Sequence, residues 1–258
     1  MRIQCEQVTK VYDRTQGELS ALANVTFNVD DNEFIGIVGP SGCGKTTLLK
    51  IIGGLLPPSS GRVELIDAPQ DNGALSALVF QDHGLFPWMT VLENVAFGLE
   101  MHGVPRAARF ERAHGFIDRV GLAHFADSYP DQLSVGMRQR VGIIRAFVTE
   151  APLLLMDEPF GALDSQTRLV LQEELLRIWE EHRKEVIFVT HDIDEAIRLS
   201  DRILVLSGRP GHVLDEVPIP LERPRVLTRR KPAEVADIKW HIWGLLEKEV
   251  RESLWVTH

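Results

Sequence analysis

The hydrophobic residues of this chain follow two alternating patterns along its length. Short and continuously apolar runs, such as "EFIGIVG", "PLLLMDEP", "EVIFVTHD" and "RILVLS", are typical of buried strands. Longer segments, such as "SQTRLVLQEELLRIWEEH", have apolar residues every three or four positions, which is typical of amphipathic helices. Because strands and helices alternate, the pattern predicts an α/β fold with a mostly parallel sheet covered on both faces.

The two ends of the chain and its middle depart from this alternation. The first thirty or so residues form short strand-like runs around a turn at 13–18. Residues 82–150 are mostly helical, and they predict an inserted helical subdomain. We expect a main domain over 1–220, followed by a connector and a final helix over 221–258. One face of that helix, predicted to pack on the main domain, carries Ile238, Ile242, Leu245 and Leu246.

The composition is that of an ordinary globular protein, with 44% hydrophobic and 25% charged residues. The net charge of −9 argues against broad binding to nucleic acid, which requires a basic face, so we expect no nucleic-acid partner. Two distant cysteines, Cys5 and Cys43, favour a reducing compartment over a disulfide framework. No apolar stretch approaches the ~20 residues of a membrane-spanning helix, and the amino terminus lacks the apolar core of a signal peptide. We therefore expect a protein that does not cross a membrane.

Residues 39–46, with the sequence "GPSGCGKT", match the eight-residue pattern of a phosphate-binding loop between a strand and a helix. The glycines at 39, 42 and 44 allow backbone conformations closed to other residues, so that successive N–H groups point at a polyphosphate. Lys45 would place its charge on the β- and γ-phosphates, and the Thr46 hydroxyl is a natural ligand for Mg²⁺. The alternative is a chance glycine-rich turn. The predicted nucleotide-binding residues of this segment are Gly39, Pro40, Ser41, Gly42, Cys43, Gly44, Lys45, Thr46 and Thr47.

Two adjacent acids, Asp157 and Glu158, end the apolar strand "LLLM". Successive side chains of a strand point to opposite faces, so the two acids are predicted to take different roles. Asp157 would face Mg²⁺, directly or through water, and Glu158 would orient or deprotonate the water that attacks the γ-phosphorus. Taken alone, an acid pair before a proline is also a common start of a helix.

Ser134 precedes the helical pattern "VGMRQRVGIIRAFV" and is predicted to be the N-cap of that helix. A helix start exposes backbone N–H groups and the positive end of the helix dipole, and it therefore attracts anions. The phosphate-binding loop lies almost a hundred residues earlier, which raises the question of whose phosphate this second helix faces.

In their order along the chain, "GPSGCGKTTLL", "LSVGMRQR", "LLLMDEPFGALD" and "VTHD" resemble the motifs of an ABC transporter ATP-binding subunit. The stretches "LFPWMTVLENVAFGL", "TRLVLQEELLRIW" and "LSGRPGHVLDEVPIPLERPR" are further similar to the nitrate, sulfonate and taurine importer subfamily. The resemblance implies a P-loop ATPase fold with a mostly parallel core sheet, an N-terminal antiparallel β subdomain and an inserted helical subdomain. It also implies an ATPase that uses ATP and Mg²⁺.

Four further residues take roles from this resemblance. Tyr12 matches the aromatic residue that stacks on adenine, although a strand aromatic packed on a core is the alternative. Gln81 matches the residue that reaches Mg²⁺ and the attacking water. Asp164 matches the acid of the D-loop, and His191 matches the switch histidine that contacts the γ-phosphate.

In this family two ATP-binding subunits pair head to tail. The resemblance therefore implies that Ser134 and Gly136 contact the γ-phosphate of an ATP held by a second copy of the chain. Val135 departs from the family, which usually has glycine there, because valine is β-branched and prefers negative φ. If the backbone there required positive φ or a close approach to phosphate, closure or turnover would weaken. Since Ser134, Gly136 and "MRQR" are present, we expect a working site.

The resemblance further implies a complex of two such subunits, two transmembrane permease subunits and, indirectly, an external solute-binding protein. The subunit would lie at the cytoplasmic face of the inner membrane as a peripheral protein. Phe86, Pro87 and Trp88 form an apolar loop suited to contact with a permease subunit. The alternative is that Trp88 anchors the core of the helical subdomain. The solute stays open among nitrate, alkanesulfonates, taurine and related small compounds.

Two other classes of protein share part of this pattern. Non-transport ABC ATPases that act in DNA repair or on the ribosome usually carry two cassettes, a long coiled coil or basic extensions, and this chain has one cassette and an acidic balance. A nucleotide-binding protein without turnover is disfavoured by Glu158.

Overall fold

The computed structural model describes residues 1–15, 17–68, 74–80, 84–223, 225 and 232–255. The chain is divided into two compact units, Met1–Ala68 with Lys184–His258, and Pro69–Arg183. We call these the first unit and the second unit. The strands include both parallel and antiparallel pairs, and helices connect the parallel ones, which confirms the predicted α/β class.

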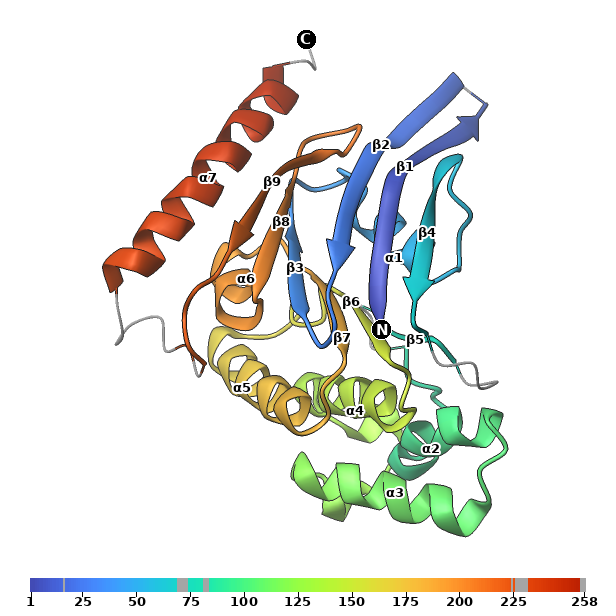
Figure 1. The fold of residues 1–258 in the computed structure, drawn as a ribbon. Coiled ribbons are helices and arrows are strands. Elements are labelled where there is room, and N and C mark those ends of the chain that lie inside the picture. The colour runs from blue at the N-terminus through green and yellow to red at the C-terminus, as the bar shows by residue number, and fades with distance from the viewer. Residues whose placement is uncertain (16, 69–73, 81–83, 224, 226–231, 256–258) are drawn as a thin grey trace. The chain divides into compact units, whose positions relative to one another are not determined.

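An antiparallel sheet in the first unit is built from β1 (Arg2–Arg14), β2 (Gly17–Val29) and β4 (Ser60–Ile66), in the order β2-β1-β4 (Figure 1). Side chains of β2 alternate: Val25 and Phe27 are buried, whereas Thr26 is exposed. This alternation is expected of an antiparallel sheet with one face on the core and one in water. The predicted N-terminal antiparallel β subdomain is confirmed.

The other strands of the first unit are β3 (Phe34–Val38), β7 (Glu185–Val189), β8 (Arg202–Leu206) and β9 (Val213–Pro218). They lie in the order β7-β3-β8-β9, and β3 is parallel to both of its neighbours, whereas β9 is antiparallel to β8. Every residue of β3 and β7 is buried, as expected of strands covered on both faces. Helix α1 (Lys45–Ile52) follows β3, and α6 (Ile193–Leu199) follows β7.

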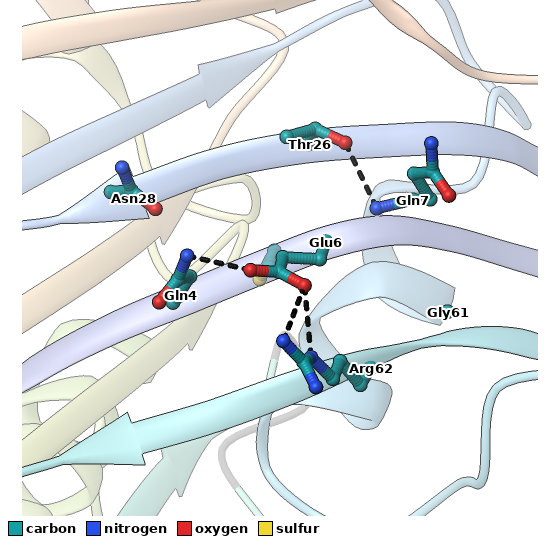
Figure 2. Close-up of a pocket in the computed structure, with 8 residues that line it drawn as sticks. Gln4, Glu6, Gln7, Thr26, Asn28, Gly61 and Arg62 are labelled. Atoms are coloured by element: carbon teal, nitrogen blue, oxygen red, sulfur yellow. Dashed lines mark hydrogen bonds and ion pairs between the residues drawn. The ribbon is translucent and has the colours of Figure 1, made fainter.

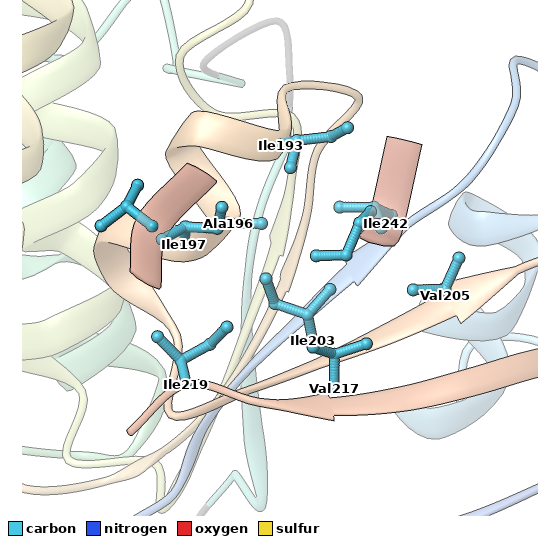
Figure 3. Packing of buried hydrophobic residues seen from close by; sticks show 10 residues of the cluster. Ile193, Ala196, Ile197, Ile203, Val205, Val217, Ile219 and Ile242 are labelled. Atoms are coloured by element: carbon cyan, nitrogen blue, oxygen red, sulfur yellow. The ribbon is translucent and has the colours of Figure 1, made fainter. Parts of the chain in front are cut away.

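The last helix, α7 (Pro232–Trp255), packs on α6, β8 and β9 of the same unit (Figures 1 and 3). Ile242 is fully buried in a cluster that includes Ile197, Ile203 and Val217 (Figure 3). The other residues predicted for this face are partly buried against the same cluster, namely Ile238, Leu245 and Leu246. The predicted packing face of the final helix is therefore confirmed.

The second unit holds two parallel strands and the predicted helical insertion. The strands are β5 (Ser76–Val79) and β6 (Leu153–Asp157). The helices are α2 (Val91–Met101), α3 (Arg106–Arg119), α4 (Val135–Val148) and α5 (Ser165–Glu181), with the short 3-10 helices η1 (Ala123–Phe125) and η2 (Pro130–Gln132). Among the residues that the structure describes, no helix has the length and apolarity needed to span a bilayer.

Candidate functional site

The phosphate-binding loop lies between the buried strand β3 and the start of α1. Gly42 and Gly44 have φ angles of 74° and 109°, in the left-handed region that favours glycine. Gly39 has no such angle. Glycine is needed at this position because neighbouring atoms leave no room for a side chain. A Cβ atom at Gly39 would lie 2.9 Å from Cys43 Sγ and 3.0 Å from the Leu206 carbonyl oxygen. The expectation that all three glycines provide unusual backbone angles is therefore wrong for Gly39.

Lys45 lies inside this loop and is only 6% exposed. Its ammonium group donates hydrogen bonds to the carbonyl oxygens of Gly39 at 2.8 Å and Pro40 at 3.0 Å. A buried ammonium needs acceptors around it, and the two carbonyls hold the charge at the centre of the loop. The positive end of the α1 dipole and the lysine charge therefore act at the same place, which suits a polyphosphate.

Cys43, also in the loop, is fully buried. Burial raises the pKa of its thiol, although the neighbouring Lys45 acts in the opposite direction. The side chain therefore packs as a small apolar group, and any contact that Cys43 makes with phosphate would come from its backbone.

Tyr12 stands on β1 beside the first turn of α1. Its hydroxyl oxygen lies 3.3 Å from Oγ1 of Thr47, and the Lys10 ammonium lies 5.3 Å from the centroid of its ring. The side chain is half-buried rather than part of the core. This setting leaves ring surface beside the phosphate-binding helix, and the predicted contact with adenine stays a prediction.

His191 follows β7, the strand that pairs in parallel with β3. The register places Val189 opposite Ile37, and the Thr190 N–H donates to the Ile37 carbonyl at 3.1 Å. Since the carboxyl ends of parallel strands meet at one edge of a sheet, His191 lies at the edge from which the phosphate-binding loop leaves. Thr190 is fixed by a hydrogen bond from its hydroxyl to Oε2 of Glu195 at 2.6 Å, which holds the backbone just before His191.

Asp157 and Glu158 belong to the second unit, where the buried strand β6 ends at Asp157. Glu158 has a φ of 46°, which is uncommon for a residue other than glycine. The chain turns immediately afterwards, with the Gly161 N–H donating to the Glu158 carbonyl at 3.1 Å. Such backbone angles are concentrated at functional positions. Here the angle changes the direction of the chain directly after the buried strand β6.

The start of α4 also belongs to the second unit. Ser134 is its N-cap, as predicted, and its hydroxyl accepts a hydrogen bond from the Met137 N–H at 3.3 Å. Gly136 faces the start of α5 so closely that a Cβ atom would lie 3.0 Å from Cγ2 of Thr167. Asp164 caps α5 and accepts from the Thr167 N–H at 3.0 Å. Two helix starts therefore lie side by side, and the Thr167 hydrogen bonds lower the pKa of Asp164.

Val135 is the first residue of α4 and has a helical backbone, not a positive φ. Its side chain is 39% exposed. Positive φ is therefore not required here, and valine adopts this backbone without strain. The effect of its side chain on the close approach of phosphate stays a prediction.

The apolar loop at 86–88 is held by a residue that the sequence did not single out. Asn94 of α2 is fully buried and exchanges hydrogen bonds with the backbone N–H and carbonyl of Phe86, at 2.8 and 3.1 Å. Its amide also donates to the carbonyl oxygens of Met89 and Thr90, both at 3.0 Å. Trp88 is 69% exposed, so it does not anchor the core of its unit. The sequence did contain a signal for this role, because Asn94 is a polar residue on the otherwise apolar face of "TVLENVAFGL".

The described candidate residues fall into two sets. Tyr12, the phosphate-binding loop and His191 lie in the first unit, and the residues from Ser134 to Asp164 lie in the second. Gln81 lies outside the described residues.

A polar pocket opens on the antiparallel sheet of the first unit, and Figure 2 shows Glu6 between Gln4 and Arg62. The Glu6 carboxylate accepts from Gln4 Nε2 at 2.7 Å and from Arg62 Nε at 2.8 Å, so its charge is paired within the pocket. The predicted site residues that the structure describes do not line this pocket.

Residues 22–161 match the ABC transporter family. The chain is 48% identical, over 98% of its length and 94% of the relative, to an uncharacterized ABC transporter ATP-binding protein of Methanocaldococcus jannaschii. It is 48% identical to the taurine import ATP-binding protein of Burkholderia thailandensis (81% of this chain, 80% of that protein). It is 42% identical to the nitrate import ATP-binding protein of Synechocystis sp. (86% and 84%).

A solved structure with similar architecture is a dimeric ATP-binding cassette in a post-hydrolysis state, bound to ADP and phosphate. It superposes with a TM-score of 0.73 and 35% identity, covering 85% of this chain and 100% of that one. The chain belongs to the ABC transporter family, and it is an ATPase. Within that family it groups with the ATP-binding subunits of importers.

Proposed function

We propose that this chain is the subunit that powers an ABC importer for a small anion or organic solute of the nitrate, sulfonate or taurine type. The observation that carries the proposal is the phosphate-binding loop, with buried Lys45 at its centre and His191 at the neighbouring strand end. The names of the taurine and nitrate import relatives support the class of solute.

Nucleotide binding is assigned to the first unit. The backbone N–H groups of residues 39 and 41–47 and the Lys45 ammonium hold the β- and γ-phosphates, and the ring of Tyr12 stacks on adenine. His191 contacts the γ-phosphate from the neighbouring strand end. These roles agree with a cationic loop whose glycines at 42 and 44 adopt left-handed angles.

Mg²⁺ is assigned to the Thr46 hydroxyl, Asp157 and Gln81. All three offer oxygen donors, which Mg²⁺ prefers, and the ion usually takes one or two protein ligands together with phosphates and water. When bound, Mg²⁺ neutralises charge on the β- and γ-phosphates.

Hydrolysis is assigned to Glu158. Its carboxylate accepts a proton from the water whose oxygen attacks the γ-phosphorus, and the bond between the γ-phosphorus and the bridging oxygen breaks to give ADP and phosphate. The position of Glu158 at the end of a rigid, buried strand supports this role, because a general base must hold its direction.

We further propose that two copies pair head to tail. Ser134 and Gly136 of one copy then contact the γ-phosphate held by the other, and Asp164 lies in the same interface. ATP favours closure because it makes contacts in the closed dimer that the open dimer lacks. The dimeric cassette bound to ADP and phosphate supports this arrangement.

The loop of Phe86, Pro87 and Trp88 is assigned to contact with a transmembrane permease subunit at the cytoplasmic face of the membrane. The exposed Trp88 ring packs on Phe86, with 5.6 Å between centroids, and Asn94 fixes the loop beneath it. An exposed tryptophan on a rigid loop is suited to binding a partner. An external solute-binding protein would deliver the solute to two such permease subunits.

The proposal is tested first with Glu158→Gln. We expect this variant to bind ATP, to lose hydrolysis by about 100-fold or more, and to form a stable ATP-bound dimer in light-scattering chromatography. Glu173→Gln, at an exposed position of α5, is the matched control and should behave as wild type. Rapid hydrolysis by Glu158→Gln would remove Glu158 from its role.

A second measurement compares ATPase activity with and without co-expressed membrane subunits. An importer subunit should hydrolyse ATP faster in the assembled complex when solute-loaded binding protein is added. Trp88→Ala should lose this stimulation while it keeps its basal ATPase activity. Unchanged stimulation in Trp88→Ala would remove the loop from the permease contact.

A further inference from the structure

The turn between β8 and β9 is unusually well ordered by its own hydrogen bonds. Ser207 is 1% exposed, and its hydroxyl accepts from the His212 N–H at 2.9 Å and lies 2.8 Å from Nδ1 of His212. The Ser207 N–H donates to the His212 carbonyl at 2.9 Å. The four residues between them, 208–211, are therefore held as a rigid projection at the end of two strands.

This turn contacts two successive residues of the phosphate-binding loop. The Arg209 guanidinium donates from Nε and Nη2 to the Gly42 carbonyl oxygen, at 3.1 and 2.9 Å. Gly211 is packed so closely that a Cβ atom there would lie 2.2 Å from the Cys43 carbonyl oxygen. The Gly211 N–H and carbonyl also bond β2, at Ala21 and Ala23, at 3.0 and 2.9 Å.

The other side of the turn is tied to the last helix. The Gly208 N–H donates to Oε2 of Glu249 at 2.7 Å, and Glu249 is half-buried on α7. A carboxylate acceptor makes this one of the stronger classes of hydrogen bond. Along the chain of contacts, α7 holds the turn through Glu249, and the turn holds the phosphate-binding loop through Arg209.

The peptide group that Arg209 holds belongs to the proposed phosphate-binding loop. A peptide unit is planar and trans, so the Gly42 carbonyl and the Cys43 N–H point in opposite directions. With the carbonyl bonded to Arg209, the Cys43 N–H points the opposite way and donates to the Pro40 carbonyl at 3.3 Å. Gly42, with its φ of 74°, has the freedom to turn this peptide the other way.

We propose that Arg209 is a positioning residue for nucleotide binding, and that Glu249 of α7 sets its turn in place. Arg209 acts by fixing the direction of the Gly42–Cys43 peptide before nucleotide arrives, so that less ordering is required on binding. This inference rests on the proposed nucleotide site of the first unit. It adds a residue 167 positions away from Gly42, outside the nucleotide-binding motifs.

The test uses the full chain and measures the affinity for a fluorescent ADP analogue. Arg209→Ala should bind it about 3- to 10-fold more weakly, the effect of losing a charge-assisted contact that orders a loop. Arg209→Lys should recover part of the loss, because the ammonium group keeps the charge and can still donate to the Gly42 carbonyl, but without the two-pronged geometry of the guanidinium. Arg251→Ala, which removes an exposed arginine that pairs with Glu247 inside α7, is the matched control and should bind as wild type.

The ATPase assay gives a readout that general destabilisation would not produce. Arg209→Ala should raise the KM for ATP by the same factor as it weakens ADP binding, with kcat unchanged at saturating ATP and an unchanged melting temperature. A fall in kcat at constant KM would overturn the positioning role. Wild-type ADP affinity in Arg209→Ala would overturn it as well.

Glu249→Gln tests the link to α7, with Glu247→Gln as its control two residues earlier on the same helix. Glu249→Gln should weaken ADP binding in the same direction as Arg209→Ala but less, and adding Arg209→Ala to it should cause less than the sum of the two losses. Fully additive losses would separate Glu249 from Arg209. A wild-type chain that binds no nucleotide would refute the proposed function itself.

Discussion

The two helix starts predicted to face phosphate, those of α1 and α4, are built in different ways. Helix α1 begins after Gly44, whose left-handed backbone is the N-cap, and no side chain in the described part of the chain caps it. Helix α4 begins after Ser134, whose hydroxyl already accepts a hydrogen bond from the Met137 N–H. The first N–H groups of α1 are therefore available to a phosphate without a competing side-chain cap, whereas at α4 the Met137 N–H already donates to the serine hydroxyl.

The two starts also differ in charge. The α1 loop carries buried Lys45 at its centre, whereas the first three residues of α4 are Val135, Gly136 and Met137, which are uncharged. A dipole alone is a weak anion site, and a dipole with a desolvated cation is a strong one. We therefore expect α1 to hold nucleotide by itself, and α4 to act on a phosphate that is already held elsewhere.

Lys45→Ala is the strongest test of this difference. We expect the ADP affinity of the isolated chain to fall about 100-fold or more, because the buried cation of the loop is lost. Lys50→Ala, at an exposed position of the same helix, should leave the affinity unchanged. Titration of a fluorescent ADP analogue measures both, and equal affinities would show that α1 is not the primary phosphate site.

Ser134→Ala should have little effect on ADP affinity in the isolated chain but reduce ATPase turnover by about 10-fold, as expected from the loss of one hydrogen bond to the charged transition state. The lost helix cap should also destabilise the fold by about 1 kcal/mol in chemical unfolding. Ser134→Asp separates the two effects, because aspartate caps the helix but repels phosphate. It should restore stability and not turnover. Restored turnover would show that the serine acts only as a cap.

Val135→Gly should affect the stability of the fold more than the ATPase activity. Glycine at a helical position lowers stability by about 0.5–1 kcal/mol, and Val135 already has the backbone angles that the helix needs. ATPase activity should stay within a few fold of wild type or rise. A collapse of activity, measured at saturating ATP, would contradict the view that the side chain at this position is exposed and replaceable.

The smallest expected effect is that of Asp164→Asn on the pH dependence of stability. Hydrogen bonds from the side chain and backbone of Thr167 lower the pKa of its carboxyl in the folded state below the ordinary value of 3.8. Because the folded-state pKa is the lower one, the stability from this cap is present above 3.8 and is lost as the pH falls through the folded-state pKa. Asp164→Asn should reduce the acid loss of stability, measured by urea unfolding on both sides of that pH. Asp118→Asn, at an exposed position of α3, should not.

The features that the sequence predicted correctly are local ones. The loop of residues 39–46 is contiguous, and the predicted left-handed angles occur at Gly42 and Gly44. The strand β6 and the cap at Ser134 are likewise determined by neighbouring residues, since burial and capping follow short patterns. The alternation of strands and helices was enough to give the α/β class.

Features that depend on contacts between distant residues could not be predicted from the sequence. Gly39 is required by the Leu206 carbonyl, which lies on a strand far along the chain. Arg209 contacts Gly42 across 167 positions, and no periodic pattern connects them. The role of Asn94 depends on the carbonyl groups of a loop that only the fold brings over it.

Both cysteines of the chain are buried, and burial raises the pKa of Cys5 to about 12. Maleimide probes react with thiolates, so a cysteine introduced on the surface will take up label far faster than either native one. Dyes or spin labels can therefore be placed on the exposed face of α5 in the otherwise native sequence. Cys43 stays untouched inside the nucleotide loop, and distances between labelled copies can be followed through a catalytic cycle in a fully active protein.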